Sequence, residues 1–193
     1  PVQVRAGLPY ATDFETDEGY RPGSLEGQGG WSMVAGNTAL TASVWYHGTS
    51  SVALLPAIPS TRMELSLAPS SASPSAVVFT DLYIKPIAAV TPEAGRVRDA
   101  SGARVAFVLS GNHGEFRVFQ GDTFGSGTWQ AAELPAVVSL NASRQAADWV
   151  RLTLRQDFVA KIWDISVNGA LVAINLRFTA STIPDFTSLT LYG

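Results

Sequence analysis

The chain contains no cysteine, which excludes a disulfide framework, thiolate metal sites and a cysteine nucleophile. Its only two histidines, His47 and His113, lie far apart and form no HExxH or HxH pattern, so a catalytic zinc site has no support. Only 15% of the residues are charged, and the formal net charge is −3. Because no basic patch is present, nucleic acid and anionic membranes are poor partners. No apolar run approaches the roughly 20 residues that span a bilayer.

The 193 residues are enough for one large β-sandwich, and we expect residues 1–193 to form a single domain. A hydrophobic content of 46% is typical of a globular protein. The chain starts at Pro1 without a basic-then-apolar leader. We therefore expect that a signal peptide has been removed or that the chain was cut from a longer one.

Short alternating strands dominate the sequence. Residues 149–156 (WVRLTLRQ) are the clearest case, because Val150, Leu152 and Leu154 face one way while arginines and threonine face the other. Residues 161–167 and 170–176 flank Asn168-Gly169, the strongest short signal for a β-hairpin. Further strands are predicted at 62–67, 77–85, 103–109, 115–120 and 188–192. The best helix candidate is residues 142–148, at most two turns long, so the pattern predicts an all-β protein with two antiparallel sheets.

Four ordered motifs carry a family resemblance: DFETDEGYRPGSLEGQGGW near the N-terminus, VVFTDLYIKP, GNHGEFRVFQGD and DWVRLTLRQDFVAKIWDISVNGALV. Together they resemble the concanavalin A-like (laminin G-like) jelly-roll domains of secreted bacterial proteins. The resemblance spans nearly the whole chain. It implies a two-sheet antiparallel β-sandwich and a secreted, cell-surface or periplasmic location. That superfamily includes lectins, glycoside hydrolases, lyases and structural domains, so the resemblance does not select an activity.

An acidic block at residues 13–18 is the first candidate site. As a catalytic pair, Glu15 and Asp17 would share one face of a strand, but Glu18 would point away and Gly19 follows at once. The block also precedes the first predicted strands. The chain has no G-x-S-x-G elbow either, so we predict that it is not an enzyme.

Calcium is the better functional interpretation of this block. Asp13, Glu15 and Asp17 offer hard oxygen ligands at a spacing of two, although the glycine and final glutamate of an EF-hand loop are missing. One structural calcium ion is therefore the only cofactor that the sequence suggests. The simpler interpretation, which we favour, is an exposed acidic strand with Phe14 held in the core.

Aromatic residues provide the candidates for carbohydrate binding, because sugars lay their C–H faces against aromatic rings while polar side chains bind the hydroxyls. Two clusters in predicted loops fit this description. Their members are Trp45, Tyr46 and His47 in the first, and Asn112, His113, Asp122 and Trp129 in the second. Packing is the simpler interpretation of Trp45 and Tyr46, because large aromatic residues at strand ends are more often lids on the core than sugar platforms. We expect Trp31 and Trp163 to lie in the core.

These features favour a non-catalytic extracellular module of a larger protein that binds a glycan, a cell-surface polysaccharide or another adhesion partner. Neither nucleic acid nor membrane insertion is expected. Two alternatives stay open. A glycoside hydrolase or polysaccharide lyase would need two carboxylates facing one groove. A purely structural spacer would need neither exposed aromatics nor exposed acids.

Overall fold

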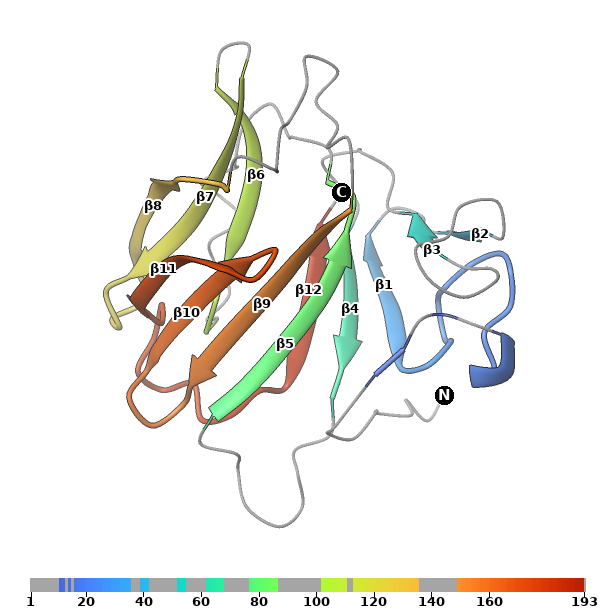
Figure 1. Ribbon diagram of the computed structural model, residues 1–193. Coiled ribbons are helices and arrows are strands. Elements are labelled where there is room, and N and C mark those ends of the chain that lie inside the picture. Colours follow the sequence, from blue (N-terminus) through green and yellow to red (C-terminus); the bar gives the residue numbers. More distant parts are fainter. Residues whose placement is uncertain are drawn as a thin grey trace. The chain divides into compact units, whose positions relative to one another are not determined.

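The structure, a computed structural model, describes residues 11–12, 14, 16–35, 39–41, 52–54, 62–67, 77–86, 102–110, 113–135 and 149–192. These residues form twelve strands and one 3-10 turn, Thr16–Glu18, which confirms the prediction of an all-β protein. The helix candidate at 142–148 lies outside the described residues. Contacts divide the chain into two compact units, Pro1–Pro74 with Phe186–Gly193 and Ser75–Asp185 (Figure 1). The single domain over 1–193 stays a prediction.

The first unit contains a three-stranded antiparallel sheet. Its strand order is β1 (Trp31–Ala35), β4 (Arg62–Ser66) and β12 (Ser188–Tyr192), and a separate short pair joins β2 (Ala39–Thr41) to β3 (Val52–Leu54). The buried core of this unit is formed by Tyr20, Leu25, Trp31, Leu65 and Leu67. Trp31 is therefore a core residue, as predicted.

A glycine-rich turn leads into β1. Gln28 holds it together, because its side-chain Oε1 accepts a hydrogen bond from the Arg21 N–H at 2.7 Å while its Nε2 donates to the Arg21 and Ser24 carbonyls. Gly29 has a positive φ of 54°, and a Cβ atom there would lie 1.9 Å from the Tyr20 hydroxyl. Glycine is therefore required where the backbone passes over a core ring.

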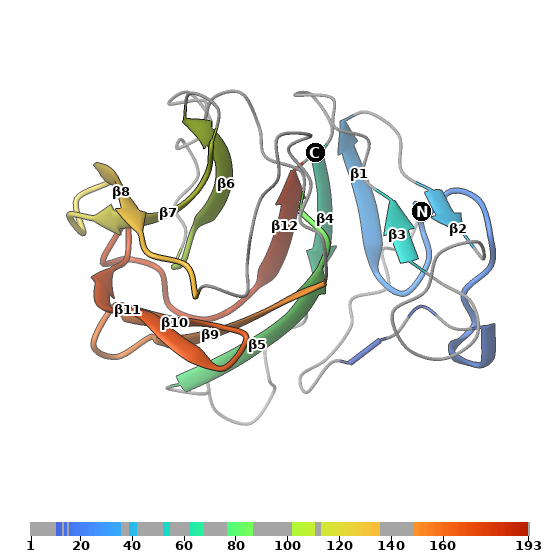
Figure 2. The same cartoon turned by 45° about the horizontal axis from the view of Figure 1, so that its top comes forward.

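The second unit contains two antiparallel sheets. The four-stranded sheet has the order β11 (Ala170–Arg177), β10 (Ile162–Val167), β9 (Val150–Asp157) and β5 (Val77–Ile84). The three-stranded sheet has the order β6 (Val105–Ser110), β7 (His113–Gly121) and β8 (Gly127–Ala132). Figure 2 shows the three-stranded sheet to one side of the four-stranded sheet, with β7 against β11. The predicted strands in this unit are found with ends within two residues of the expected ones.

Alternation gives the four-stranded sheet one buried face. Trp163, Ile165 and Val167 of β10 are fully buried, and they pair with Gln156, Leu154 and Leu152 of β9, which are buried as well. Trp163 is thus the core residue that the sequence predicted. The opposite face, formed by the intervening residues, is called the outer face below.

The Asn168-Gly169 turn joins β10 to β11 as predicted. Both residues have positive φ, 49° and 81°, as a type I′ turn requires. Asn168 also ties the turn to β9, because its Oδ1 accepts from the Arg151 N–H at 2.8 Å and its own N–H donates to the Arg151 carbonyl at 2.9 Å. This turn therefore fixes the register of three strands.

Candidate functional site

The structure describes only some of the predicted sugar-binding residues. Trp45, Tyr46, His47 and Asn112 lie outside the described residues. The backbone of His113 begins β7, where it pairs with Ser110. This pairing shows that β6 and β7 form the hairpin predicted around residues 110–114.

Asp122 lies at the opposite end of β7, in the turn to β8. Its Oδ1 accepts hydrogen bonds from the N–H groups of Phe124 at 2.8 Å and Ser126 at 2.9 Å. These two donors hold the pKa of the Asp122 carboxyl below its ordinary value. The carboxylate thus closes the β7–β8 turn.

Trp129 lies on β8 and not in a loop. It pairs with Phe119, and the two rings meet edge to face with centroids 5.2 Å apart. Its buried indole N–H has no hydrogen-bond partner among the described residues. Since His113 and Phe119 are six residues apart on β7, roughly 20 Å of strand separates His113 from Trp129. These two predicted residues therefore do not share one small site.

The predicted calcium ligands are only partly described. Asp13 and Glu15 lie outside the described residues, and Asp17 is exposed in the 3-10 turn Thr16–Glu18. Phe14 has a positive φ of 64° and packs against Tyr20 with ring centroids 5.3 Å apart. Phe14 thus packs on the core as expected, but its positive φ and the 3-10 turn Thr16–Glu18 are not the conformation of an extended strand. No group of three potential metal ligands occurs among the described residues.

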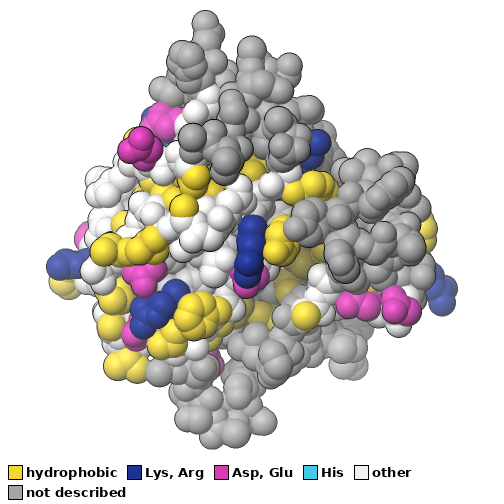
Figure 3. All heavy atoms as spheres, in the orientation of Figure 1, with side chains coloured by type: hydrophobic (Ala, Val, Ile, Leu, Met, Phe, Trp, Pro, Cys, Tyr) yellow, Lys and Arg dark blue, Asp and Glu magenta, His cyan; other side chains and the backbone are white. Residues whose placement is uncertain are grey.

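Two exposed aromatic rings stand on the outer face of the four-stranded sheet. Phe79 is 66% exposed and Tyr83 is 44% exposed, and both lie on β5 with Asp81 between them. Figure 3 shows hydrophobic and charged side chains intermixed over this sheet. Large apolar side chains exposed together on one sheet face are candidates for a binding surface.

An ion pair lies between the two rings. Arg151 of β9 donates from Nε and Nη2 to the two carboxylate oxygens of Asp81, at 3.1 and 3.0 Å, and the Thr153 hydroxyl donates to the same carboxylate. The Arg151 hydrogen bonds are the main cause that holds the pKa of Asp81 below its ordinary value. The guanidinium also lies 5.7 Å from the centroid of the Tyr83 ring, within the range of a cation–π interaction.

A second set of charges continues across the sheet. Arg155 of β9 donates to Asp157 and to Asp164, each at 3.2 Å. Asp164 also accepts the Asn175 N–H at 2.8 Å, where β11 takes a positive φ of 55°. The N–H groups of the β9–β10 turn, Ala160 first among them, hold the pKa of Asp157 below its ordinary value. The polar groups of the outer face are thus fixed in place by one another.

Neither Asp81 nor Asp157 is poised to act as a general acid. A general acid at neutral pH needs a carboxyl whose pKa is raised, whereas the pKa values of Asp81 and Asp157 are lowered. The face instead presents exposed rings beside oriented hydrogen-bonding groups. Sequence reasoning placed residues 77–85 on a strand but did not single out Phe79 or Tyr83, although the two-residue period puts both on one face with Asp81.

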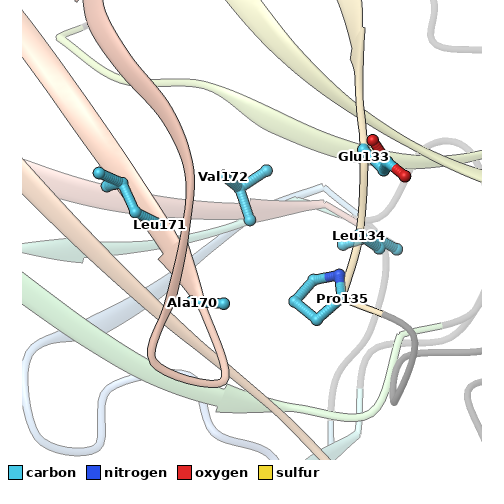
Figure 4. A pocket seen from close by; sticks show the side chains of 6 residues that line it. All are labelled: Glu133, Leu134, Pro135, Ala170, Leu171 and Val172. Atoms are coloured by element: carbon cyan, nitrogen blue, oxygen red, sulfur yellow. The ribbon is translucent and has the colours of Figure 1, made fainter.

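A separate pocket of about 410 Å³ lies beside the tip of the β10–β11 hairpin (Figure 4). Val172 and Pro135 point into it from opposite sides, while Leu171 points away towards the other face of β11. Its other lining residues are Glu133, Leu134 and Ala170. Every side chain that lines the pocket except that of Glu133 is apolar.

Comparison with protein-family models, with curated proteins and with solved structures finds no match to this chain. Within the described ranges, no helix has the length and apolar character that crossing a membrane requires.

Proposed function

We propose that this chain is a non-catalytic, extracellular carbohydrate-binding or adhesion module of a larger protein, built as a concanavalin A-like jelly roll. The observation that carries the proposal is the pair of exposed rings, Phe79 and Tyr83, on one sheet face with a fixed ion pair between them. The antiparallel sheets and their alternating burial support the jelly-roll part of the proposal.

The chemistry of the outer face matches that of a glycan. Sugar rings present flat C–H faces that pack on aromatic rings, and their hydroxyl groups both donate and accept hydrogen bonds. Phe79 and Tyr83 supply the rings, while Asp81 and Arg151 supply an acceptor and a donor already held in position. Because these polar groups are fixed before the ligand arrives, binding costs little side-chain entropy.

The alternative functions are less well supported by the same face. A hydrolase would need one carboxyl with a raised pKa opposite a second carboxylate, and Asp81 is instead held ionised by Arg151. A purely structural spacer would have no use for two exposed rings arranged around an ion pair.

Glycan binding by the purified domain tests the proposal. We expect the wild type to bind on a glycan array and to release no reducing sugar from the bound glycan. Tyr83→Ala and Phe79→Ala should each weaken binding about tenfold, or ~1.4 kcal/mol, because each removes one stacking contact. The matched control is Phe124→Ala, which removes a 91% exposed ring in the β7–β8 turn and should leave binding unchanged. Absence of binding, or equal losses in all three variants, would contradict the proposal.

A further inference from the structure

We propose that the ligand of the outer face is a linear, uncharged polysaccharide chain that lies along β5 and contacts Phe79 and Tyr83 at the same time. This inference rests on the proposed function and adds the shape and charge of the ligand. It follows from the spacing of the two rings, the openness of the face and the balance of its charges.

The ring spacing requires an extended ligand. Phe79 and Tyr83 are four residues apart on one strand, which places them about 13 Å apart on the same face. A group stacked on an aromatic ring lies within about 7 Å of its centroid. One sugar ring therefore cannot stack on both side chains, whereas consecutive units of a chain along β5 can.

The openness of the face favours the middle of a chain over its end. The Asp81 and Arg151 side chains between and beside the rings are 44% and 45% exposed, so the polar groups lie at the surface. Recognition of a single terminal sugar calls for a concave site that encloses most of it. The pocket at the β10–β11 hairpin is a concave site, but it lies beside Val172, on the opposite side of β11 from Leu171 (Figure 4).

The charges of the face favour an uncharged ligand. Arg151 is paired with Asp81, and Arg155 is shared by Asp157 and Asp164. Because Arg177 of β11 pairs with Ile162 on the same face, the strands of the outer face carry three guanidinium groups and three carboxylates. An anionic chain would find no excess of positive charge on the strands and would have to break an ion pair to reach Arg151 or Arg155. Sugar hydroxyl groups can instead add hydrogen bonds without separating the paired charges. For example, Asp81 accepts three hydrogen bonds and has room for about four.

The test measures affinity against ligand length and ligand charge by isothermal titration calorimetry. The neutral probes are gluco-oligosaccharides of one to six units with β-1,4 or β-1,3 links, followed by soluble mannan and xylan. The acidic probes are polygalacturonate and alginate. We expect affinity to rise at least about tenfold between the monosaccharide and the longest neutral oligomers and then to level off. Raising NaCl from about 50 to about 500 mM should change the dissociation constant less than about twofold, because no charge on the ligand is screened.

Two variants locate the chain on β5. Phe79→Ala and Tyr83→Ala should each abolish the gain with length, so that a long oligomer binds no better than a short one, while Phe124→Ala keeps the gain. A monosaccharide that binds as tightly as the longest oligomer would overturn the extended chain and leave the proposed function standing. Salt-sensitive preference for polygalacturonate or alginate would overturn the uncharged ligand alone. If no glycan binds and sedimentation shows a dimer that Phe79→Ala dissociates, the face binds a second copy, which overturns both proposals.

Discussion

Gly121, at the end of β7, should be among the least replaceable residues of the second unit. It is buried, and a Cβ atom added to it would lie 2.2 Å from the carbonyl oxygen of Phe178 and 2.7 Å from the N–H nitrogen of Thr179. Both are backbone atoms, so no side-chain rotation relieves the overlap. Gly121→Ala therefore forces two backbone segments apart.

The segment at Phe178 has little freedom to move. Its carbonyl accepts from the Thr123 N–H at 3.1 Å, and its N–H donates to the Lys161 carbonyl at 3.0 Å. The Phe178 ring is fully buried and packs edge to face on Phe158 with centroids 5.2 Å apart. Overpacking of a well-packed core costs about 1–3 kcal/mol, and we expect Gly121→Ala to lower the free energy of unfolding by about 3 kcal/mol.

Gly169→Ala is the matched control, because it makes the same glycine-to-alanine change at a position where the added Cβ atom overlaps nothing. Gly169 has a φ of 81°, and a Cβ atom there would meet nothing within 4 Å. Only the conformational cost remains, and it is about 1–2 kcal/mol for an L-residue in this region.

Thermal unfolding followed by circular dichroism compares the two variants. A loss of 1 kcal/mol lowers the melting temperature of a chain of this size by about 2–4 °C. We therefore expect a decrease of about 6–12 °C for Gly121→Ala and about 2–8 °C for Gly169→Ala, with the larger decrease for Gly121→Ala. Equal melting temperatures, or a larger decrease for Gly169→Ala, would refute the claim that the Phe178 backbone cannot yield.

Two further predictions concern charge. Arg151 lowers the pKa of Asp81 in the folded state, so their pair stabilises the fold above the ordinary aspartate pKa of about 3.9, and this contribution is lost as the pH falls through the folded pKa. Since both side chains are nearly half exposed, the pair contributes under about 1 kcal/mol. Urea unfolding at pH 7 should therefore show Asp81→Asn less stable than the wild type by under about 1 kcal/mol, and this difference should shrink below pH ~4. A difference that grows in acid would contradict the pairing. If the acidic block binds calcium, a hundredfold excess over Kd should stabilise the wild type by about 2.7 kcal/mol relative to chelator. Thermal melts on wild type and Asp13→Ala check this: identical melts with and without calcium would leave the block as solvated surface, and a shift that survives the substitution would place the ion elsewhere.

The sequence predicts best those strands in which every second residue is polar. In β9, Arg151, Thr153 and Arg155 alternate with apolar residues, and an Asn-Gly pair then sets the register of the next hairpin. β8 was missed because GTWQAA begins with glycine and shows no clear apolar alternation, and its pairing with β7 defines it instead. The 3-10 turn Thr16–Glu18 was missed because the alternating acids resemble a strand, whereas the positive φ of Phe14 breaks one.

The aromatic residues of the candidate site could not be ranked by sequence alone. Trp129 is close to Asp122 in the sequence, which makes it a candidate for the same site, yet its ring packs on Phe119. In β5, large apolar residues occur at both parities, since VVFTDLYI has Val78 and Leu82 on one side and Phe79 and Tyr83 on the other. The pattern within β5 therefore leaves the buried side undecided. Pairing with a second strand decides it, and a single strand's sequence does not contain that information.

The register between β5 and β9 explains why the two rings are exposed. Phe79 pairs with Arg155 and Tyr83 pairs with Arg151, so the rings share a face with both guanidinium groups. Turning this face inward would bury two arginines, and removing a charge from water costs several kcal/mol even when it is paired. That cost exceeds the hydrophobic free energy that would be gained by burying Phe79 and Tyr83 in place of Val78 and Leu82. The aromatic rings are thus exposed because they lie on the face of β9 that carries its polar side chains. The same pairing places the rings beside the fixed polar groups that a glycan would contact.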